Sequence, residues 1–332
     1  MSLQIALPDL RKLSAAFGIL LAFTALASAQ SKLSLRHSTR RPVTNQTLSD
    51  LKDGPLRHLT VISHQVTDRG LASISRLKNL ETLSLHRTRI TDQGLAHLSS
   101  LKRLTSLQIV GSVQLSGQGL QHLSALTALR QLTFSGRVNA TSLAQLESLQ
   151  SIQQLRLTLD QKGGKDFRVL ATLPSLTSLA IVAARLDAKA LGEIATAPKL
   201  TFLTLDQCQL TDTSYPSLAM CWRLQGLHVR SIAVNDAQLS HLAQLSELKS
   251  LTLYNTKVSN EGIQRLSKLP NLAFLNLSRS KNINDGAVPV IIGFRKLQQL
   301  HLDGTSVSRA AGKQLRQALP DATIQHQLSR KP

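Results

Sequence analysis

A leucine-based unit recurs at a nearly constant interval, and this regularity constrains the fold more than any other feature of the sequence. Residues 80–103 (LETLSLHRTRITDQGLAHLSSLKR) show the unit clearly. Every unit has the length of residues 80–103 to within a single residue. The same frame restarts at Leu56, Leu80, Leu104, Leu129, Ile152, Leu176, Leu200, Leu224, Leu248, Leu272 and Leu297. A chain with such a period is expected to stack copies of one supersecondary unit.

Each unit changes its hydrophobic period halfway along. The first half alternates with period two, as in Leu83-Ser84-Leu85, which is typical of a short strand with one buried face. The second half has helical i, i+3 spacing, as in Leu95-x-x-Leu98. Between the halves lies Thr-Asp, at positions 67–68, 91–92 and 211–212, with Asn-Asp at 284–285. We expect a hydroxyl or carboxylate there to cap the helix, and the Asp to complement the helix dipole.

A single unit of this kind cannot bury its own leucines. Stacking therefore predicts a parallel sheet of strands, an opposite wall of helices and a leucine core between them. Because helices are wider than strands, the stack should curve with the sheet on the inside. Lys and Arg gather at the turns after the helices, as at Lys102 and Arg103. Part of the formal charge of +20 is thereby explained as solvated charge at helix ends.

This pattern resembles the leucine-rich repeat family, in the form L-x-x-L-x-L-x-x-T-x-I-T-D-x-G-L-x-x-L-x-x-L. That form occurs in exported bacterial proteins and is similar to the cysteine-containing repeats. The resemblance covers residues 56–324, or about eleven repeats. It implies an α/β fold: a right-handed leucine-rich-repeat solenoid (horseshoe) with a concave parallel β-sheet and convex helices. It also implies that the concave sheet binds another macromolecule.

In the family, the ninth position of the repeat faces inward, and its small polar side chain bonds backbone groups of the bending loop. Here this slot holds His64, Thr88, Ser112, Cys208, Thr256, Ser280 and Thr305. Cys221 takes the slot that Leu101 holds in the second repeat. Both cysteines are therefore expected to be buried packing residues. The alternative is a disulfide between Cys208 and Cys221, which an exported protein can form.

The N-terminal segment, residues 1–29, has the pattern of a secretory signal peptide. The basic pair Arg11-Lys12 precedes an apolar run, residues 13–26, and Ala27-Ser28-Ala29 closes it. The run is short for a membrane span, which needs about 20 apolar residues. We expect cleavage before Gln30 and an exported chain, periplasmic or secreted, that does not span the membrane. The alternative is an uncleaved N-terminal membrane anchor.

Three segments depart from the regular repeat. Residues 30–55 are polar and basic, and we expect them to be flexible up to an N-terminal capping turn near residues 48–51. Between Val138 and Phe167, one unit is a single residue shorter than the regular unit and the next replaces its turn with residues 160–165 (DQKGGK). This is either a tolerated irregular loop or a local hinge or binding loop. The last unit lacks the Asp turn and is expected to form the C-terminal cap, followed by a tail at residues 325–332.

Composition and motifs argue against catalysis. Aromatic residues make up 3% of the chain, which disfavours an aromatic-lined cofactor pocket, and two cysteines are too few for a multi-cysteine metal cluster. The sequence contains no P-loop, GxSxG, HExxH, CxxC or paired-glycine dinucleotide motif. We therefore predict a binding protein with no catalytic residues, no cofactor and no metal.

The residues between the strand leucines should point out of the concave sheet, because strand side chains alternate. Most of them are Ser, Thr or Gln, but aromatic and charged residues gather in the C-terminal half. The hypothesised partner-binding site is Phe202, Asp206, His228, Arg230, Tyr254 and Phe274. Aromatic residues and Arg dominate the energetics of many interfaces. The alternative interpretation is that Phe202 and Phe274 merely shield neighbouring strands.

Two functions from different classes remain. The first is an exported protein-interaction scaffold that binds an unidentified protein partner on its concave face. The alternative is electrostatic adhesion to an anionic polysaccharide, an envelope surface or a nucleic acid, which the formal charge of +20 favours. The expected position of Lys and Arg on turns and on the convex side, without interleaved aromatic residues, argues against a nucleic-acid reader.

Overall fold

The structure, a computed structural model, describes residues 31–159 and 166–327. The predicted signal peptide (residues 1–29), the irregular loop at residues 160–165 and the end of the tail (residues 328–332) lie outside the described residues. The chain forms two compact units. Within the described residues, the N-terminal unit comprises residues 31–115 and 119–129, and the C-terminal unit comprises residues 116–118, 130–159 and 166–327.

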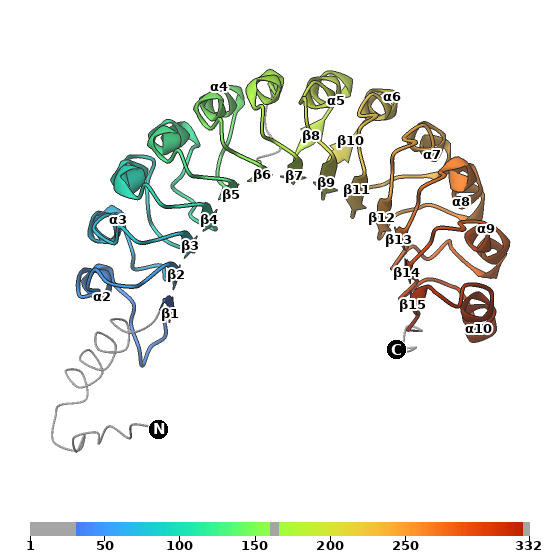
Figure 1. Cartoon of the computed structure of the whole chain (residues 1–332), viewed down its shortest axis with the longest axis horizontal. Helices are drawn as coiled ribbons and strands as arrows, with labels where there is room; N and C mark the ends of the chain where they lie inside the picture. The colour runs from blue at the N-terminus through green and yellow to red at the C-terminus, as the bar shows by residue number, and fades with distance from the viewer. Residues whose placement is uncertain (1–30, 160–165, 328–332) are drawn as a thin grey trace, which may run out of the picture. The chain divides into compact units, whose positions relative to one another are not determined.

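The N-terminal unit is a parallel sheet with short helices on its outer side (Figure 1). Its strands, in spatial order, are β1 (Lys32–Arg36), β2 (His58–Ile62), β3 (Thr82–His86) and β4 (Ser106–Val110). Its helices are α2 (Asn45–Ser49), α3 (Asp68–Ile74) and the 3₁₀ helices η2 (Gln93–Ser100) and η3 (Gln118–Ala125), the start of η3 belonging to the other unit.

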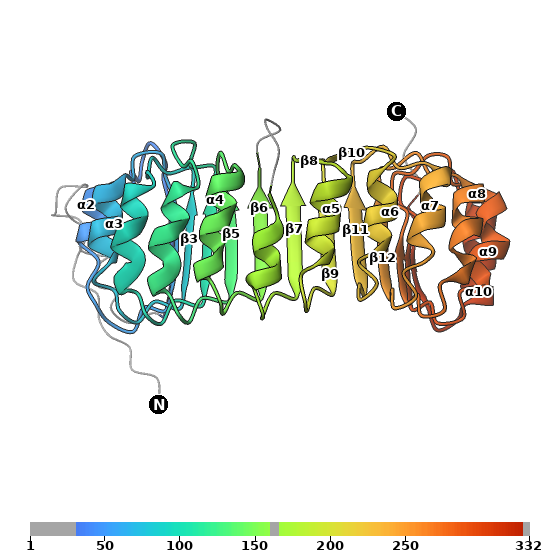
Figure 2. The same cartoon turned by 90° about the horizontal axis from the view of Figure 1, so that it is seen from above.

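The C-terminal unit continues the same pattern with a longer parallel sheet (Figure 2). Its strands, in spatial order, are β5 (Gln131–Ser135), β6 (Gln154–Thr158), β7 (Ser178–Val182), β9 (Phe202–Asp206), β11 (Gly226–Arg230), β12 (Ser250–Tyr254), β13 (Phe274–Asn276), β14 (Gln299–His301) and β15 (Thr323–Gln325). A small separate pair joins β8 (Arg185–Leu186) to β10 (Gln209–Leu210).

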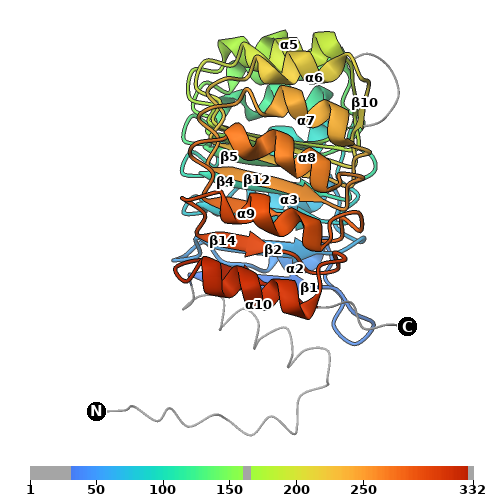
Figure 3. The ribbon, with the colours of Figure 1, turned by 90° about the vertical axis from the view of Figure 1, so that its right-hand side faces the viewer.

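The helices of the C-terminal unit form its outer layer, opposite the sheet (Figure 3). They are α4 (Ala140–Ala144), η4 (Gln145–Ser148), η5 (Arg168–Thr172), α5 (Ala188–Ala195), α6 (Ser214–Ala219), α7 (Asp236–Leu242), α8 (Asn260–Arg265), η6 (Leu266–Lys268), η7 (Asp285–Ala287), α9 (Val288–Ile292) and α10 (Arg309–Ala318). Most span only one or two turns, too short to be stable without packing. Their apolar residues face the sheet, so burial holds them in place.

The leucine core confirms the predicted fold class, an α/β leucine-rich-repeat solenoid. Neighbouring strands pair with an offset of one repeat, so Leu203 lies beside Leu227 and Leu227 beside Leu251. The strand leucines and the helix leucines of the same repeat, such as Leu85 and Leu98, are completely buried. Burying one such side chain contributes roughly 1.5–3 kcal/mol. The two periods read from the sequence therefore correspond to the two layers.

The segment before the first predicted repeat is ordered structure. Lys32–Arg36 forms β1, which pairs along its length with β2, and its side chains Leu33 and Leu35 are buried. Helix α2 follows, and Thr44 caps it through a reciprocal bond with Thr47. The prediction of a flexible segment is therefore wrong here. The alternating pair Leu33-x-Leu35 is the strand signal that identifies a further, shorter unit.

A left-handed residue ends most strands and turns the next side chain inward. At position eight of the repeat, φ is 55° at Arg87 and 53° at Gln207, while glycine occupies the slot at Gly111. The following side chains form the predicted polar ladder: the hydroxyls of Thr88 and Ser112 lie 2.7 Å apart in the interior. This arrangement satisfies polar groups that the bend would otherwise leave unpaired.

The ladder prediction is wrong for His64, which is exposed and packs its ring edge-on against His37. Ser63 takes the buried slot instead and donates a hydrogen bond of 2.5 Å to the carbonyl of Val43. Ser63 is not left-handed, in contrast to Arg87 at the same position of the next repeat. The inward slot is therefore reached one residue earlier in this first turn.

The Asp that follows Thr or Asn at the start of several helices clamps the next repeat. Asp68 accepts hydrogen bonds from the backbone N–H of Thr91 (2.8 Å) and from its hydroxyl (2.7 Å). Asp236 makes the same pair of bonds to Ser259. The side-chain cap expected at the Thr-Asp pairs is absent at Thr67, although Asp68 does lie in the first turn of its helix. Asn284 of the Asn-Asp variant caps its helix as expected. Side chains also cap at Thr44, Asn139, Asp187, Asn235, Ser259 and Ser308.

The Gly of the motif makes room for this clamp. A Cβ at Gly119 would lie 2.8 Å from the backbone of Asp92 and 2.9 Å from its carboxylate, and Cβ atoms at Gly94 and Gly262 would collide with the carboxylates of Asp68 and Asp236. A Cβ at Gly70 would likewise lie 2.8 Å from the side-chain oxygen of Asn45. Asp and Gly therefore belong to one interaction that joins consecutive repeats.

Replacing Asp236 with Ala should destabilise the protein by about 2–3 kcal/mol, because two hydrogen bonds to a charged acceptor are lost and the N–H of Ser259 is left without its partner. Urea unfolding followed by circular dichroism measures the change. Glu261→Ala is the matched control, since this exposed carboxylate lies in the first turn of α8 and should cost less than about 0.5 kcal/mol. Equal losses would contradict the clamp.

The strand register predicts unequal costs at adjacent positions of β9. Leu205 is completely buried, so Leu205→Ala should cost about 2–5 kcal/mol in the free energy of unfolding. Thr204 lies on the open face of the sheet, and Thr204→Ala should change the free energy by less than about 0.5 kcal/mol. Urea unfolding measures both free energies. A large loss of stability in Thr204→Ala would show that the two faces of the strand are misassigned.

Candidate functional site

The six sequence-predicted site residues lie on four neighbouring strands of the C-terminal unit, and we call them the concave patch. Phe202 and Asp206 are on β9, His228 and Arg230 on β11, Tyr254 on β12 and Phe274 on β13. Strand pairing places Asp206, Arg230 and Tyr254 side by side at the C-terminal ends of their strands. Phe202 and Phe274 lie at the opposite ends, about 13 Å away along the strand direction. The structure therefore divides the patch into a charged row and an aromatic row.

The charged row carries a tyrosine between two arginines. Arg230 is the direct strand neighbour of Tyr254, and the guanidinium of Arg279 lies 5.5 Å from the centre of the Tyr254 ring. A cation over an aromatic face is attracted by about 0.5–1 kcal/mol at an exposed site. Asp206 forms an exposed ion pair of 3.9 Å with Arg156, which contributes little to stability. Arg230 is exposed and forms no ion pair within the described residues.

The aromatic row is partly open to solvent. Phe202 is 44% exposed, and its ring covers Gly226 on the next strand so closely that a Cβ there would collide with it. Phe274 packs against His301 of β14, with 5.1 Å between ring centres. Phe202 and Phe274 therefore do shield neighbouring strands, as the alternative interpretation holds. The large exposed fraction of Phe202 nevertheless leaves an apolar surface available for contact.

His228 lies between the two rows and is partly buried. Its Nε2 atom is 3.2 Å from the hydroxyl of Ser250. Burial lowers the pKa of His228 below its usual 6.5, and the charge of Arg230 lowers it further. The side chain is therefore neutral at pH 7 and can either donate or accept a hydrogen bond.

Three residues in contact with the concave patch were not in the predicted set. Arg156 and His301 face the same sheet surface, at strand positions that the alternation identifies. Arg279 follows its strand in the left-handed conformation, with φ of 62°, which brings its side chain back over Tyr254. No leucine pattern marks such a turn, so sequence periodicity could not have found this contact.

The cysteines have a structural role. Cys208 and Cys221 are buried and both are free thiols, so the disulfide alternative is not realised. Cys208 lies 3.4 Å from the carbonyl of Ile181, in the predicted ladder slot. Burial raises the pKa of Cys208 and raises that of Cys221 to about 12, which leaves the thiols protonated and unreactive.

Two further searches cover the described residues, one for metal ligands and one for membrane-spanning helices. Across residues 31–159 and 166–327, no cluster of three or more His, Cys, Asp or Glu side chains could hold a metal ion. No helix in that part of the chain has the length and apolar character needed to cross a membrane.

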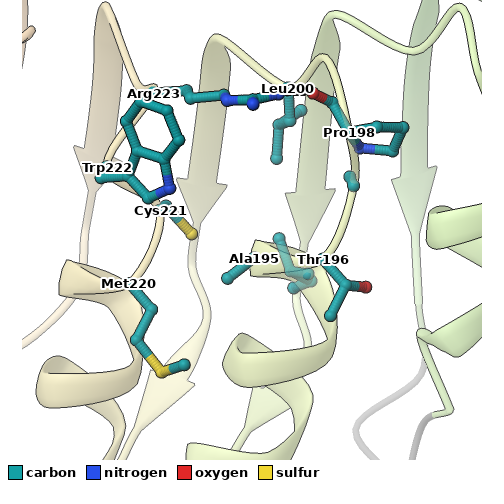
Figure 4. Close-up of a pocket in the computed structure, with 10 residues that line it drawn as sticks. Ala195, Thr196, Pro198, Leu200, Met220, Cys221, Trp222 and Arg223 are labelled. Atoms are coloured by element: carbon teal, nitrogen blue, oxygen red, sulfur yellow. Dashed lines mark hydrogen bonds between the residues drawn. The ribbon is translucent and has the colours of Figure 1, made fainter.

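A second surface feature lies at the turns between the helices and the strands of the C-terminal unit. A hollow of about 290 Å³ opens between the C-terminal ends of α5 and α6, and we call it the Trp222 hollow (Figure 4). It is lined by residues 194–198, Leu200 and residues 220–223. Met220 and Trp222 are each 60% exposed at its border. The guanidinium of Arg223 lies 4.7 Å from the centre of the Trp222 ring and also donates to the carbonyl of Pro198.

Comparison with known structures identifies the class of protein as a leucine-rich-repeat fold. An internalin (inlF) from Listeria monocytogenes has 19% sequence identity, with 95% of each chain covered and a TM-score of 0.58. The Leptospira interrogans LRR protein LIC12759 has 17% identity over 92% of this chain and 98% of its own, with a TM-score of 0.41. An internalin C2 from L. monocytogenes has 21% identity over 71% and 92%, with a TM-score of 0.42. The first similarity establishes the fold alone.

No protein-family model matches the sequence, and no curated protein matches it. The function therefore has to be inferred from the surfaces described above.

The lowered pKa of His228 makes stability depend on pH. The folded state binds the proton less readily than the unfolded state, so the contribution of His228 is present above pH 6.5 and is lost as the pH falls toward the lower pKa of the folded state. Urea unfolding at pH 7.5 and pH 5.5 should show a larger loss for the native sequence than for His228→Gln. An identical loss in both proteins would contradict the burial of this imidazole.

Proposed function

We propose that the chain is an exported protein-interaction scaffold that binds an unidentified protein partner through the concave patch. The observation that carries this proposal is the charged row, in which Tyr254 lies between Arg230 and Arg279, together with the partly exposed Phe202 at the other end of the same sheet face. Tyr and Arg are enriched among the residues that dominate binding energy, because they combine a large contact area with polar groups. The proposed role is binding, without catalysis or a cofactor.

The sequence supports export of this scaffold. The basic pair, the apolar run and Ala27-Ser28-Ala29 at the start of the chain have the pattern of a signal peptide. The proposed location is the periplasm or the extracellular medium, with an N-terminal membrane anchor as the alternative. Fractionation of the producing cells and N-terminal sequencing of the recovered protein test this part, and a chain that begins at Gln30 would support cleavage.

The concave patch should lose affinity for its partner when its anchors are truncated. Affinity capture from the exported fraction of the producing cells supplies the partner, and calorimetry measures the dissociation constant. Tyr254→Ala and Arg230→Ala should each weaken binding by about 1–3 kcal/mol. Neither change should unfold the protein, since both side chains lie on the open face of the sheet. Gln108→Ala and Ser84→Ala, on strands of the N-terminal unit, should leave affinity within about 0.5 kcal/mol.

Electrostatic adhesion to an anionic polymer or surface is the second candidate function. It is favoured by the formal charge of +20 and by cations such as Arg230 that form no ion pair within the described residues. Salt titration separates the two candidates. Adhesion should weaken steeply as the ionic strength rises, whereas an interface centred on aromatic residues should weaken only slightly.

A further inference from the structure

We infer that the edge of the C-terminal unit around the Trp222 hollow binds an anionic lipid surface. This edge consists of the turns that lead from each helix into the next strand, and these turns lie side by side (Figure 2). It shares no residue with the concave patch, so different variants test the two proposals. It also gives the second candidate function a defined surface.

The first argument is the exposure of two large apolar side chains beside the Trp222 hollow. Trp222 is the only tryptophan of the chain, and 60% of its surface is open to solvent, as is 60% of Met220. The border of the hollow includes Ile194, Pro198 and Leu200, and none of its lining residues is acidic. Figure 4 shows the Trp222 and Met220 side chains on the same side of the hollow. Exposed apolar groups of this size are unfavourable in water and mark contact surfaces.

The second argument is the charge along the same edge. Successive turns of the C-terminal unit carry more exposed cations than carboxylates. The cations are Lys199, Arg223, Lys249, Lys268, Arg295 and Lys296, and the carboxylates are those of Glu247 and Asp321. None of these cations forms an ion pair with another described residue. Each Lys or Arg near an anionic membrane strengthens binding by roughly fivefold. The edge therefore has the sign of charge that an anionic surface attracts.

The combination of these residue types favours a lipid surface over an acidic protein. Tryptophan prefers the boundary between the headgroups and the acyl chains, and the long side chains of Lys and Arg keep their charge in the headgroup layer while their methylenes contact apolar groups. Methionine adapts its shape to an irregular apolar surface. Stacked turns form a long edge rather than an enclosing groove, and such an edge matches a flat, laterally extended partner.

The test uses the emission of Trp222 in the full chain, since no other tryptophan contributes. Vesicles made from two parts phosphatidylcholine and one part phosphatidylglycerol should shift this emission to shorter wavelength, and brominated lipid in the same vesicles should quench it. Vesicles of phosphatidylcholine alone should leave the emission unchanged. This readout reports the edge itself, so insertion of the apolar run at residues 13–26 does not imitate it.

Matched charge variants test the position of the surface. Lys199→Gln with Lys268→Gln removes two charges from the edge, and neither side chain forms a hydrogen bond or ion pair with a described residue. This variant should weaken vesicle binding by about 10–30-fold. Lys257→Gln with Lys281→Gln removes two charges from the loops after β12 and β13, at the opposite edge of the unit, and should weaken binding less than threefold.

Three outcomes would overturn the proposal: an emission spectrum that anionic vesicles leave unchanged, an equal response to neutral vesicles, or equal losses in the two double variants. A shift caused by polyglutamate but not by anionic vesicles would also overturn it, in favour of an acidic protein partner. None of these outcomes bears on the concave patch, which contains no tryptophan.

Discussion

Burial of leucines between neighbouring repeats is the interaction on which the rest of the structure depends. Leu203, Leu227 and Leu251 occupy the same slot of consecutive strands, and each is buried because the next repeat covers it. The helices that close the core are short, so their conformation depends on the same contacts. Stability in such a chain is close to a sum over repeats and their interfaces. The exposed surfaces are therefore free to vary without disturbing the core.

The sequence predicts the layers because a strand and a helix have different hydrophobic periods. Leucine spacing identified the strand faces correctly, and the concave patch lies on adjacent strands as expected. The misassigned residues lie where backbone geometry, rather than burial, decides the outcome. His64 was assigned by counting, but its turn reaches the buried slot one residue earlier, at Ser63. Arg279 joins Tyr254 through a left-handed bend that leaves no hydrophobic signature.

The proposed binding surfaces follow from how this fold distributes side chains. Every second residue of each strand faces the open side of the sheet. A row such as Asp206, Arg230 and Tyr254 therefore requires only that neighbouring repeats differ at equivalent positions. The edge that carries Trp222 is built from turns, whose side chains the core does not constrain. One unit can therefore present two surfaces of different chemistry, one for a shaped partner and one for an extended anionic layer.

The clamp between Asp and Gly has a consequence for how this chain can change its length. The Asp and the Gly lie in consecutive repeats. Whether a repeat can be exchanged without a steric clash therefore depends on the repeats at its two junctions and not only on its own sequence. At one junction Asp236 faces Gly262 of the next repeat. At another, Ala188 stands at the position of the Asp, and the next repeat has Ser214 at the position of the Gly. Gly is not required at every junction, because Gln238 donates a hydrogen bond of 2.6 Å to Asp212 of the preceding repeat, so the side chains that meet at a junction have to match. A repeat can therefore be duplicated or lost without strain only where the residue at the Asp position fits the residue at the Gly position of its new neighbour.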